Sequence, residues 1–221
     1  MKTTIISFYS DIGDDKYYTE NYKRLAHECF SYGIPHDFRN LESHNDYRLN
    51  CLRKPQFILD VLREKKEPIV WLDIDSTIHS SLDIFDDAKD HCDLAFAFPS
   101  FNNEGIPNSA PKASPIFVNY NEKVIAFLQF WVDACQESIT LGEKFFDHEI
   151  LLLKVLPKNN HLRILTLPHE YCVWPGRCPE GVTPIITMGI ADGASKEKNL
   201  RELAPLLGMS ESNIQFNLNK V

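Results

Sequence analysis

A run of four apolar residues, Ile69 to Leu72, follows Pro68 and leads directly into two aspartates, Asp73 and Asp75. The run contains no polar side chain that could face water on one side of a strand. Strands that are apolar on both faces are typical of sheets covered by helices on both sides. The run therefore predicts a buried central strand in an α/β domain.

Strand and helix patterns alternate on both sides of this run, as in a sheet built with crossover helices. Gly33 and Pro35 end one helical pattern, and Pro55 suits the first turn of another. We predict strands over 3–9, 34–38, 69–72, 94–98, 116–119 and 162–167, and helices from Tyr18, from Pro55, around 124–135, over 149–156 and over 196–207. This order predicts an α/β fold with a mostly parallel, mixed central sheet flanked by helices.

Length and composition favour one globular unit. The chain has 221 residues, of which 43% are hydrophobic, which is enough for one full-sized core and too few for two. We therefore expect a single domain over 1–221, with a nucleotide-binding part over about 1–100 and an acceptor-side part over about 101–221. The apolar start is too short for a signal peptide, and no run reaches the roughly 18 apolar residues of a membrane span. We expect a cytoplasmic protein without a membrane span.

Charge and cysteine usage narrow the class further. The formal net charge of −8 argues against a generic nucleic-acid coat. Six scattered cysteines without a C-x-x-C pair indicate buried free thiols in a reducing compartment, and His169, Cys172 and Cys178 lack a fourth ligand for zinc. We expect a solvated loop and helix face to carry the acids that follow the aspartate pair: Asp83, Asp86, Asp87, Asp90 and Asp93.

The aspartate pair is the most informative local motif. In α/β sheets, ligands collect at the carboxyl ends of strands, where Asp73 and Asp75 are predicted to lie. Two neighbouring carboxylates repel each other unless a cation lies between them, and their hard oxygen atoms suit Mg²⁺ or Mn²⁺. Such a metal neutralises a diphosphate leaving group. The alternative is a polar strand end in which one aspartate caps a turn.

Two enzyme classes place a D-x-D motif after a strand. Asp73-Ile74-Asp75-Ser76-Thr77 resembles the nucleophile motif of haloacid-dehalogenase-like phosphatases, in which Asp73 would attack phosphorus and Asp75 would act as acid or base. That motif normally ends the first strand of its domain and has a glycine where this chain has Ser76. Asp192 is the one faint candidate here for the late acidic motif of those phosphatases.

The second resemblance covers most of the chain. Lys54-Pro55-Gln56-Phe57-Ile58, followed by Pro68-Ile69-Val70-Trp71-Leu72-Asp73-Ile74-Asp75, is similar to an arrangement in small nucleotide-diphospho-sugar transferases. Ile116 to Asn119, a helix bearing Trp131, and Phe146-Asp147-His148-Glu149-Ile150-Leu151 resemble their later strand, helix and D-Q-x-x-L box, with His148 in place of glutamine. The chain thus resembles glycosyltransferases of the GT-A fold, which is Rossmann-like.

This resemblance implies a role for several residues. The first strand, with Ser7 and Tyr9, would meet the nucleotide, and Lys54 would supply a cation for the donor phosphates; the alternative for Lys54 is an exposed lysine at a helix start. Asp73 and Asp75 would hold Mn²⁺ or Mg²⁺, with Asp73 also near the ribose. Lys196, at a helix start, would contact the diphosphate. Relatives often add a late histidine as third metal ligand; here Asp192 or water would replace it.

On the acceptor side, the resemblance implies that Asp147 faces the acceptor or sugar as a base or orienting group, although capping of a helix also accounts for this residue. The implied reaction is metal-dependent transfer of a hexosyl or pentosyl group from a nucleoside-diphosphate sugar, with a UDP-sugar favoured, to an acceptor hydroxyl. Phage or bacterial enzymes of this kind act on glycans or on hydroxymethylated DNA bases. A non-catalytic nucleotide-binding module is a further alternative.

Overall fold

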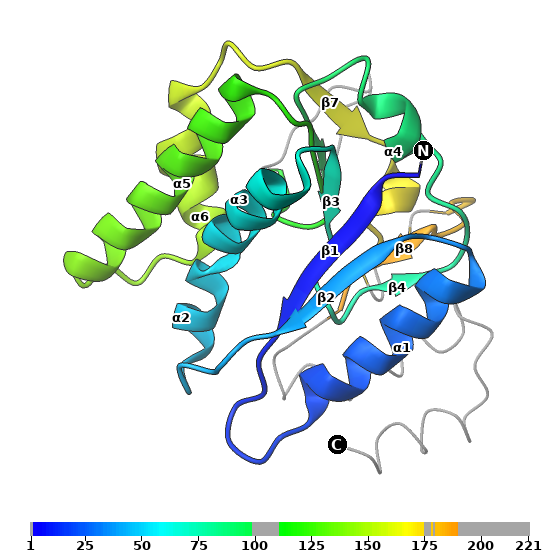
Figure 1. Ribbon diagram of the computed structural model, residues 1–221, viewed down its shortest axis with the longest axis horizontal. Coiled ribbons are helices and arrows are strands. Elements are labelled where there is room, and N and C mark those ends of the chain that lie inside the picture. Colours follow the sequence, from blue (N-terminus) through cyan, green and yellow to red (C-terminus); the bar gives the residue numbers. More distant parts are fainter. Residues whose placement is uncertain (1, 99–110, 175–177, 179, 190–221) are drawn as a thin grey trace.

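The computed structural model describes residues 2–98, 111–174, 178 and 180–189 (Figure 1). Six strands form one sheet in the order β2-β1-β3-β6-β5-β7. The pairings β1–β2, β1–β3 and β5–β7 are parallel, whereas β6 runs antiparallel to both of its neighbours, β3 and β5. The strands are β1 (Thr4–Tyr9), β2 (His36–Asn40), β3 (Ile69–Trp71), β5 (Leu94–Ala97), β6 (Ile116–Val118) and β7 (Ile164–Leu167).

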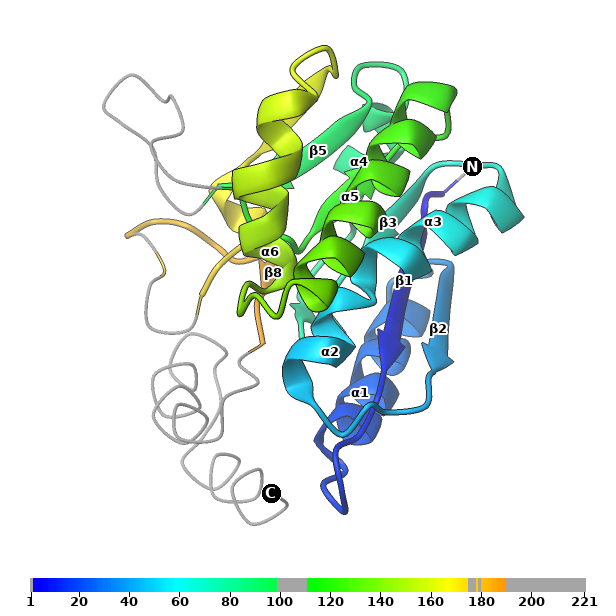
Figure 2. The ribbon, with the colours of Figure 1, turned by 90° about the vertical axis from the view of Figure 1, so that its left-hand side faces the viewer.

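Helices cover both faces of this sheet, as Figures 1 and 2 show. Asp46 and Asn121 cap α2 and α5 by accepting hydrogen bonds from Leu49 N–H and Val124 N–H, and Pro55 lies in the first turn of α3. The helices are α1 (Tyr17–Ser31), α2 (Tyr47–Leu52), α3 (Lys54–Lys65), α4 (Ile84–Ala88), α5 (Glu122–Thr140) and α6 (Asp147–Ile150). A π-helical turn over Leu151–Val155 and a 3-10 turn over Leu156–Lys158 continue α6, and a further 3-10 turn covers His169–Tyr171.

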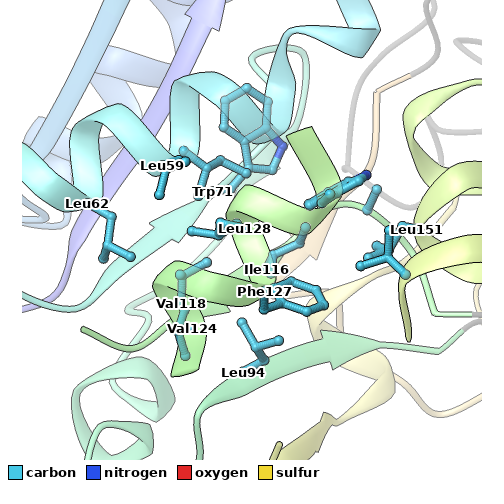
Figure 3. Close-up of a cluster of buried hydrophobic side chains, with 14 of the residues drawn as sticks. Leu59, Leu62, Trp71, Leu94, Ile116, Val118, Val124, Phe127, Leu128 and Leu151 are labelled. Carbon is cyan, nitrogen blue, oxygen red and sulfur yellow. The ribbon is translucent and has the colours of Figure 1, made fainter. Parts of the chain in front are cut away.

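Two hydrophobic cores lie on opposite faces of the sheet because successive strand residues point in opposite directions. In β3, Ile69 and Trp71 pack into the core beneath α3 and α5, and Val70 packs into the core beneath α1 and α4. Figure 3 shows the first core, where Leu59 and Leu62 of α3 meet Phe127 and Leu128 of α5 around the sheet. The run of apolar residues is therefore buried on both faces, as its sequence predicts.

Most predicted elements are confirmed, with small shifts at their ends. The predicted helix over 149–156 is instead the short α6 followed by π-helical and 3-10 turns. The predicted helix over 196–207 lies outside the described residues. The sequence reading missed α2, α4 and a small second sheet in which β4 (Thr77–Ile78) pairs antiparallel with β8 (Ile186–Thr187). These elements are two to six residues long, too short to show a periodic pattern.

Four of the six cysteines, Cys29, Cys92, Cys135 and Cys172, are buried free thiols, as the sequence predicts for most of them. None of the helices in the described part of the chain has the length and apolar character needed to cross a bilayer.

Asp93 departs from the expectation of a solvated acidic face. Asp83, Asp87 and Asp90 are exposed, but Asp93 is only 4% exposed. Its carboxylate accepts hydrogen bonds from Arg163 N–H at 2.9 Å and from Asn121 Nδ2 at 3.1 Å. It thereby joins the start of β5 to β7 and to the N-terminus of α5. Burial alone would raise the pKa of Asp93, but the hydrogen bonds from Arg163 and Asn121 hold it below its ordinary value.

Replacing Asp93 should therefore destabilise the fold. We expect Asp93→Ala to lower the free energy of unfolding by about 2 kcal/mol at pH 7, because buried donors lose a charged acceptor. Because the folded-state pKa is lowered, this contribution is present above the ordinary carboxyl pKa and is lost as the pH falls below about 4. Urea unfolding at pH 7 and at about pH 2, well below the ordinary carboxyl pKa, measures both effects. Asp90→Ala, at an exposed position, is the matched control and should change stability by less than about 0.5 kcal/mol; an equal loss in both variants would contradict this account.

Candidate active site

The chain turns sharply after β3, and backbone contacts fix this turn. Asp73 N–H donates to Ser114 Oγ at 2.9 Å, and Ser76 N–H donates to Asp73 O at 2.9 Å. Trp71 Nε1 donates to Asp73 Oδ1 at 2.9 Å, which orients the carboxylate. The first aspartate of the motif is thus held both by its backbone and by the last residue of the strand.

Helix α1 holds the second aspartate. Tyr17 OH donates to Asp75 Oδ2 at 3.2 Å. Arg24 donates to Asp75 O at 3.0 Å and to Thr77 Oγ1 at 2.5 Å, while it forms an ion pair with Glu28 at 2.9 Å. Side chains of α1 therefore fix residues 75–77, the segment that follows β3, by hydrogen bonds.

Gly189 makes a close backbone approach to the same aspartate. A Cβ atom added at Gly189 would lie 2.1 Å from Asp75 Cγ and 2.5 Å from Asp75 O and Oδ1. No larger residue fits there without movement of one of the two segments, because atoms cannot approach this closely. Gly189 follows β8, and β8 pairs with β4, which begins two residues after Asp75. The two-stranded sheet therefore places Gly189 against the D-x-D motif.

Lys54, the first residue of α3, lies between Asp73 and Asp147. Its Nζ is 3.1 Å from Asp73 Oδ1 and 2.9 Å from Asp147 Oδ2, and it donates to Ala113 O at 3.1 Å. Lys54 is 8% exposed and Asp147 is 3% exposed. The alternative of an exposed lysine at a helix start is therefore wrong. Trp131 Nε1 of α5 donates to Asp147 O at 3.2 Å and fixes the first residue of α6.

These groups line a cavity of about 390 Å³ at the carboxyl end of β3. Asp73, Asp75 and Asp147 face it, together with Lys54 and Lys112. Its apolar walls are mostly aromatic, which is typical of small-molecule sites. The aromatic residues that line it are Phe8, Tyr9, Tyr18, Tyr47, Trp71, Phe146, His148 and Trp174.

The charges inside the cavity shift the pKa values of its groups. Burial and the neighbouring Asp73 carboxylate raise the pKa of Asp75 to about 6. Burial would lower the pKa of Lys54, but Asp147 and Asp73 more than offset this and raise it. Burial would raise the pKa of Asp147, yet the ammonium group of Lys54 holds it below its ordinary value. The cavity therefore contains an ion-paired cluster of Lys54, Asp73 and Asp147 beside a second aspartate, Asp75, whose charged form is disfavoured.

The predicted site residues fall into three groups. Tyr9, Lys54, Asp73, Asp75 and Asp147 all line the cavity. Ser7 is fully buried within β1 and is not among the lining residues. His169, considered above only as a zinc ligand, lies in a 3-10 turn outside the lining. Lys196 and Asp192 lie outside the described residues. The roles assigned to these residues stay predictions.

Metal ligation was the expected task of Asp73 and Asp75. Within residues 2–98, 111–174, 178 and 180–189, no three His, Cys, Asp or Glu side chains gather closely enough to hold a metal together. The described residues engage Asp73 through Oδ1 and Asp75 through Oδ2. What the described part offers is therefore a pair of carboxylates, and any further protein ligand would come from outside it.

Several site residues were missed by sequence reasoning. Tyr17 and Arg24 lie on α1, which was predicted as a helix, but no local pattern shows that its polar side chains reach residues 75–77. Gly189 lies in an unremarkable apolar segment, and its value becomes visible only when the distance to Asp75 is known. Tyr47 was missed because α2 was not expected.

Comparisons with known proteins give a likeness of fold. Neither the known protein families nor the curated proteins include a match to this sequence. Among solved structures, the chain is similar to the crystal structure of a glycosyltransferase involved in the glycosylation of the major capsid of PBCV-1. The TM-score is 0.66 and the sequence identity 13%, over 90% of this chain and 98% of that chain. The predicted fold class, a Rossmann-like, mostly parallel α/β sheet flanked by helices, is confirmed.

Proposed function

We propose that this protein is a metal-dependent glycosyltransferase of the GT-A type that moves a sugar from a nucleoside-diphosphate sugar to an acceptor hydroxyl. The observation that carries the proposal is the position of Asp73 and Asp75 in the lining of a largely aromatic cavity, just after the carboxyl end of the central strand. The fold shared with a glycosyltransferase supports it. The whole chain would act as one unit, with the donor bound mainly by residues before about 100.

The two aspartates fit a divalent cation. Their carboxylates are close enough for Asp73 to raise the pKa of Asp75, a repulsion that a cation would relieve. Asp73 Oδ2 and Asp75 Oδ1 are not used in the contacts described above and would provide hard oxygen ligands for Mn²⁺ or Mg²⁺. When bound, the ion would neutralise the departing diphosphate.

The aromatic walls fit a nucleotide. Tyr9 stacks on Tyr22 with ring centroids 4.6 Å apart, and Phe8 packs against Trp71 at 5.4 Å, so these rings are held in place before a ligand arrives. Flat rings that are fixed in advance bind a base or a sugar face with little loss of side-chain freedom. We propose a UDP-sugar as the donor, with Tyr9 in the nucleotide part of the cavity.

Asp147 is the proposed acceptor-side residue. Its carboxylate lines the cavity and is kept ionised by Lys54, so it can accept a hydrogen bond from an acceptor hydroxyl. His148 and Phe146, next to it, stack with ring centroids 6.0 Å apart, and Tyr47 lies 5.8 Å from Phe146. A sugar or a base bearing a hydroxyl group fits beside such rings, in keeping with a glycan or a hydroxymethylated DNA base as acceptor.

Ligand binding tests this proposal. We expect UDP together with Mn²⁺ to raise the melting temperature by about 5–10 °C at about 100 times the dissociation constant, because a ligand that binds the folded state stabilises it. UDP alone or Mn²⁺ alone should give a much smaller shift in melting temperature. In the proposed function, the diphosphate binds to the protein through the metal ion, so each ligand needs the other. Differential scanning fluorimetry makes the measurement.

The same assay separates the alternatives. A haloacid-dehalogenase-like phosphatase would be stabilised by beryllofluoride, which mimics a phospho-aspartate at Asp73, and would not respond to UDP. Stabilisation by beryllofluoride without any effect of UDP and Mn²⁺ would overturn the proposal. Stabilisation by UDP and Mn²⁺, without transfer or hydrolysis of any sugar donor, would indicate a non-catalytic nucleotide-binding module.

A further inference from the structure

Lys54 is a buried lysine whose ammonium group is surrounded by protein oxygen atoms. An ammonium group carries three N–H donors and no acceptor. Lys54 Nζ has three oxygen atoms within 3.1 Å: Asp147 Oδ2, Asp73 Oδ1 and Ala113 O. It also lies 5.4 Å from the centre of the Trp71 ring. Its position is therefore accounted for by the protein, without a ligand.

Burial makes this arrangement energetically demanding. A buried charge is tolerated only when it is paired and hydrogen-bonded, and removing one partner leaves the others uncompensated. Lys54 is 8% exposed, and one of its two carboxylate partners, Asp147, is 3% exposed. The buried charges of Lys54 and Asp147 therefore each require the other. Lys54 also forms an ion pair with Asp73.

The two aspartates reach the cavity from different parts of the fold. Asp73 follows β3 and Asp147 begins α6, and Lys54 begins α3, which packs against α5. Trp71 Nε1 donates a hydrogen bond to Asp73 Oδ1, and Trp131 Nε1 donates one to Asp147 O. Lys54 is the direct connection between the two carboxylates.

We infer that Lys54 is a positioning residue that fixes the metal-side carboxylate of Asp73 relative to the acceptor-side carboxylate of Asp147, and that it does not contact the donor diphosphate. This inference rests on the proposed function, in which these aspartates serve donor and acceptor. It changes the task that the family resemblance implies for Lys54, because three protein oxygen atoms already surround its ammonium group within 3.1 Å. Geometry of this kind governs turnover, since misplacement by about 1 Å can cost about a hundredfold in rate.

Binding and turnover separate the two roles. For Lys54→Met we expect the dissociation constant of UDP, measured by calorimetry with saturating Mn²⁺, to change by less than about threefold, whereas kcat falls by about a hundredfold. A lysine that contacts the diphosphate would instead weaken UDP binding by about tenfold or more, because charge-assisted hydrogen bonds are strong. That result would overturn the inference. Lys123→Met, at an exposed position on α5, is the matched control and should leave both values unchanged.

A double-mutant cycle with Asp147→Asn tests the coupling. If Lys54 acts through Asp147, the kcat of Lys54→Met/Asp147→Asn should be no more than about threefold below that of the slower single variant. Losses that multiply would show independent roles and contradict the inference. The melting temperatures provide a second measurement that needs no activity: the double variant should melt above Lys54→Met, because it removes a buried carboxylate left without its partner. A double variant that melts below both single variants would contradict the inferred dependence of Lys54 and Asp147 on each other.

These measurements also keep the inference apart from the proposed function. If the wild-type protein binds no UDP in the presence of Mn²⁺, the proposed function fails, and the melting cycle still decides whether Lys54 and Asp147 depend on each other. If the wild-type protein binds UDP and turns over a donor while the cycle shows no coupling, only the positioning role fails.

Discussion

Asp75→Ala should reduce metal-dependent turnover of the sugar donor by at least about a hundredfold. In the proposed function, Asp75 is a ligand of the cation that neutralises the leaving diphosphate, and losing one such electrostatic contact typically costs about 10²–10³ in rate. The fold should survive, because the network from Arg24 reaches the backbone oxygen of residue 75 and Thr77 without using the Asp75 side chain. Removing a carboxylate that its neighbour repels should leave the melting temperature of the ligand-free protein the same or higher.

The measurement is the rate of nucleotide release from the donor, with Mn²⁺ varied. Asp90→Ala removes an exposed aspartate that lies outside the cavity lining and should behave like the wild type. Equal Mn²⁺-dependent rates in the wild type and Asp75→Ala would show that Asp75 does not hold the metal.

The second large effect is expected at Gly189. The methyl group of Gly189→Ala would lie 2.1 Å from Asp75 Cγ, so either the segment after β8 or the aspartate must move. We expect donor turnover to fall by about a hundredfold, because the carboxylate that we propose as a metal ligand is displaced. The free energy of unfolding should fall by about 1–3 kcal/mol, as for other cases of overpacking.

Gly181→Ala is the matched control for this effect. Gly181 has a φ of +77°, and a Cβ atom there meets no atom within 4 Å. The substitution should therefore cost about 1 kcal/mol through backbone strain and leave turnover unchanged. The opposite outcome would be a Gly189→Ala variant that keeps full activity and loses no more stability than Gly181→Ala. That result would show that the close approach to Asp75 has no functional role.

The sequence patterns were sufficient to predict the six strands of the main sheet. Apolar runs such as 69–72 and 94–97 are buried on both faces, so their composition reports their position directly. The order of the strands was not predictable in the same way, because β6 enters antiparallel between β3 and β5, and pairing depends on contacts distant in sequence. Asp93 shows the limit of composition: five neighbouring acids look alike in the sequence, but Asp93 lies where β7 and the start of α5 supply buried donors.

The candidate site was predictable where residues follow a strand or repeat a family motif. Asp73, Asp75, Asp147 and Lys54, to which the resemblance assigns roles, line one cavity, and the roles themselves stay predictions. The partners of these residues were not predictable, because each pairing joins distant segments. Lys54 reaches Asp147 across 93 positions and Tyr17 reaches Asp75 across 58, separations at which no local pattern operates.

Donor turnover by the wild-type protein tests the central claim most directly. The protein is incubated with a panel of nucleoside-diphosphate sugars, with Mn²⁺, with Mg²⁺ and with EDTA, and the released nucleoside diphosphate is quantified. Our account predicts release from at least one donor, with UDP-sugars preferred, that depends on the metal and is abolished by EDTA. Absence of release from every donor with either metal, or release that is unaffected by EDTA, would contradict it.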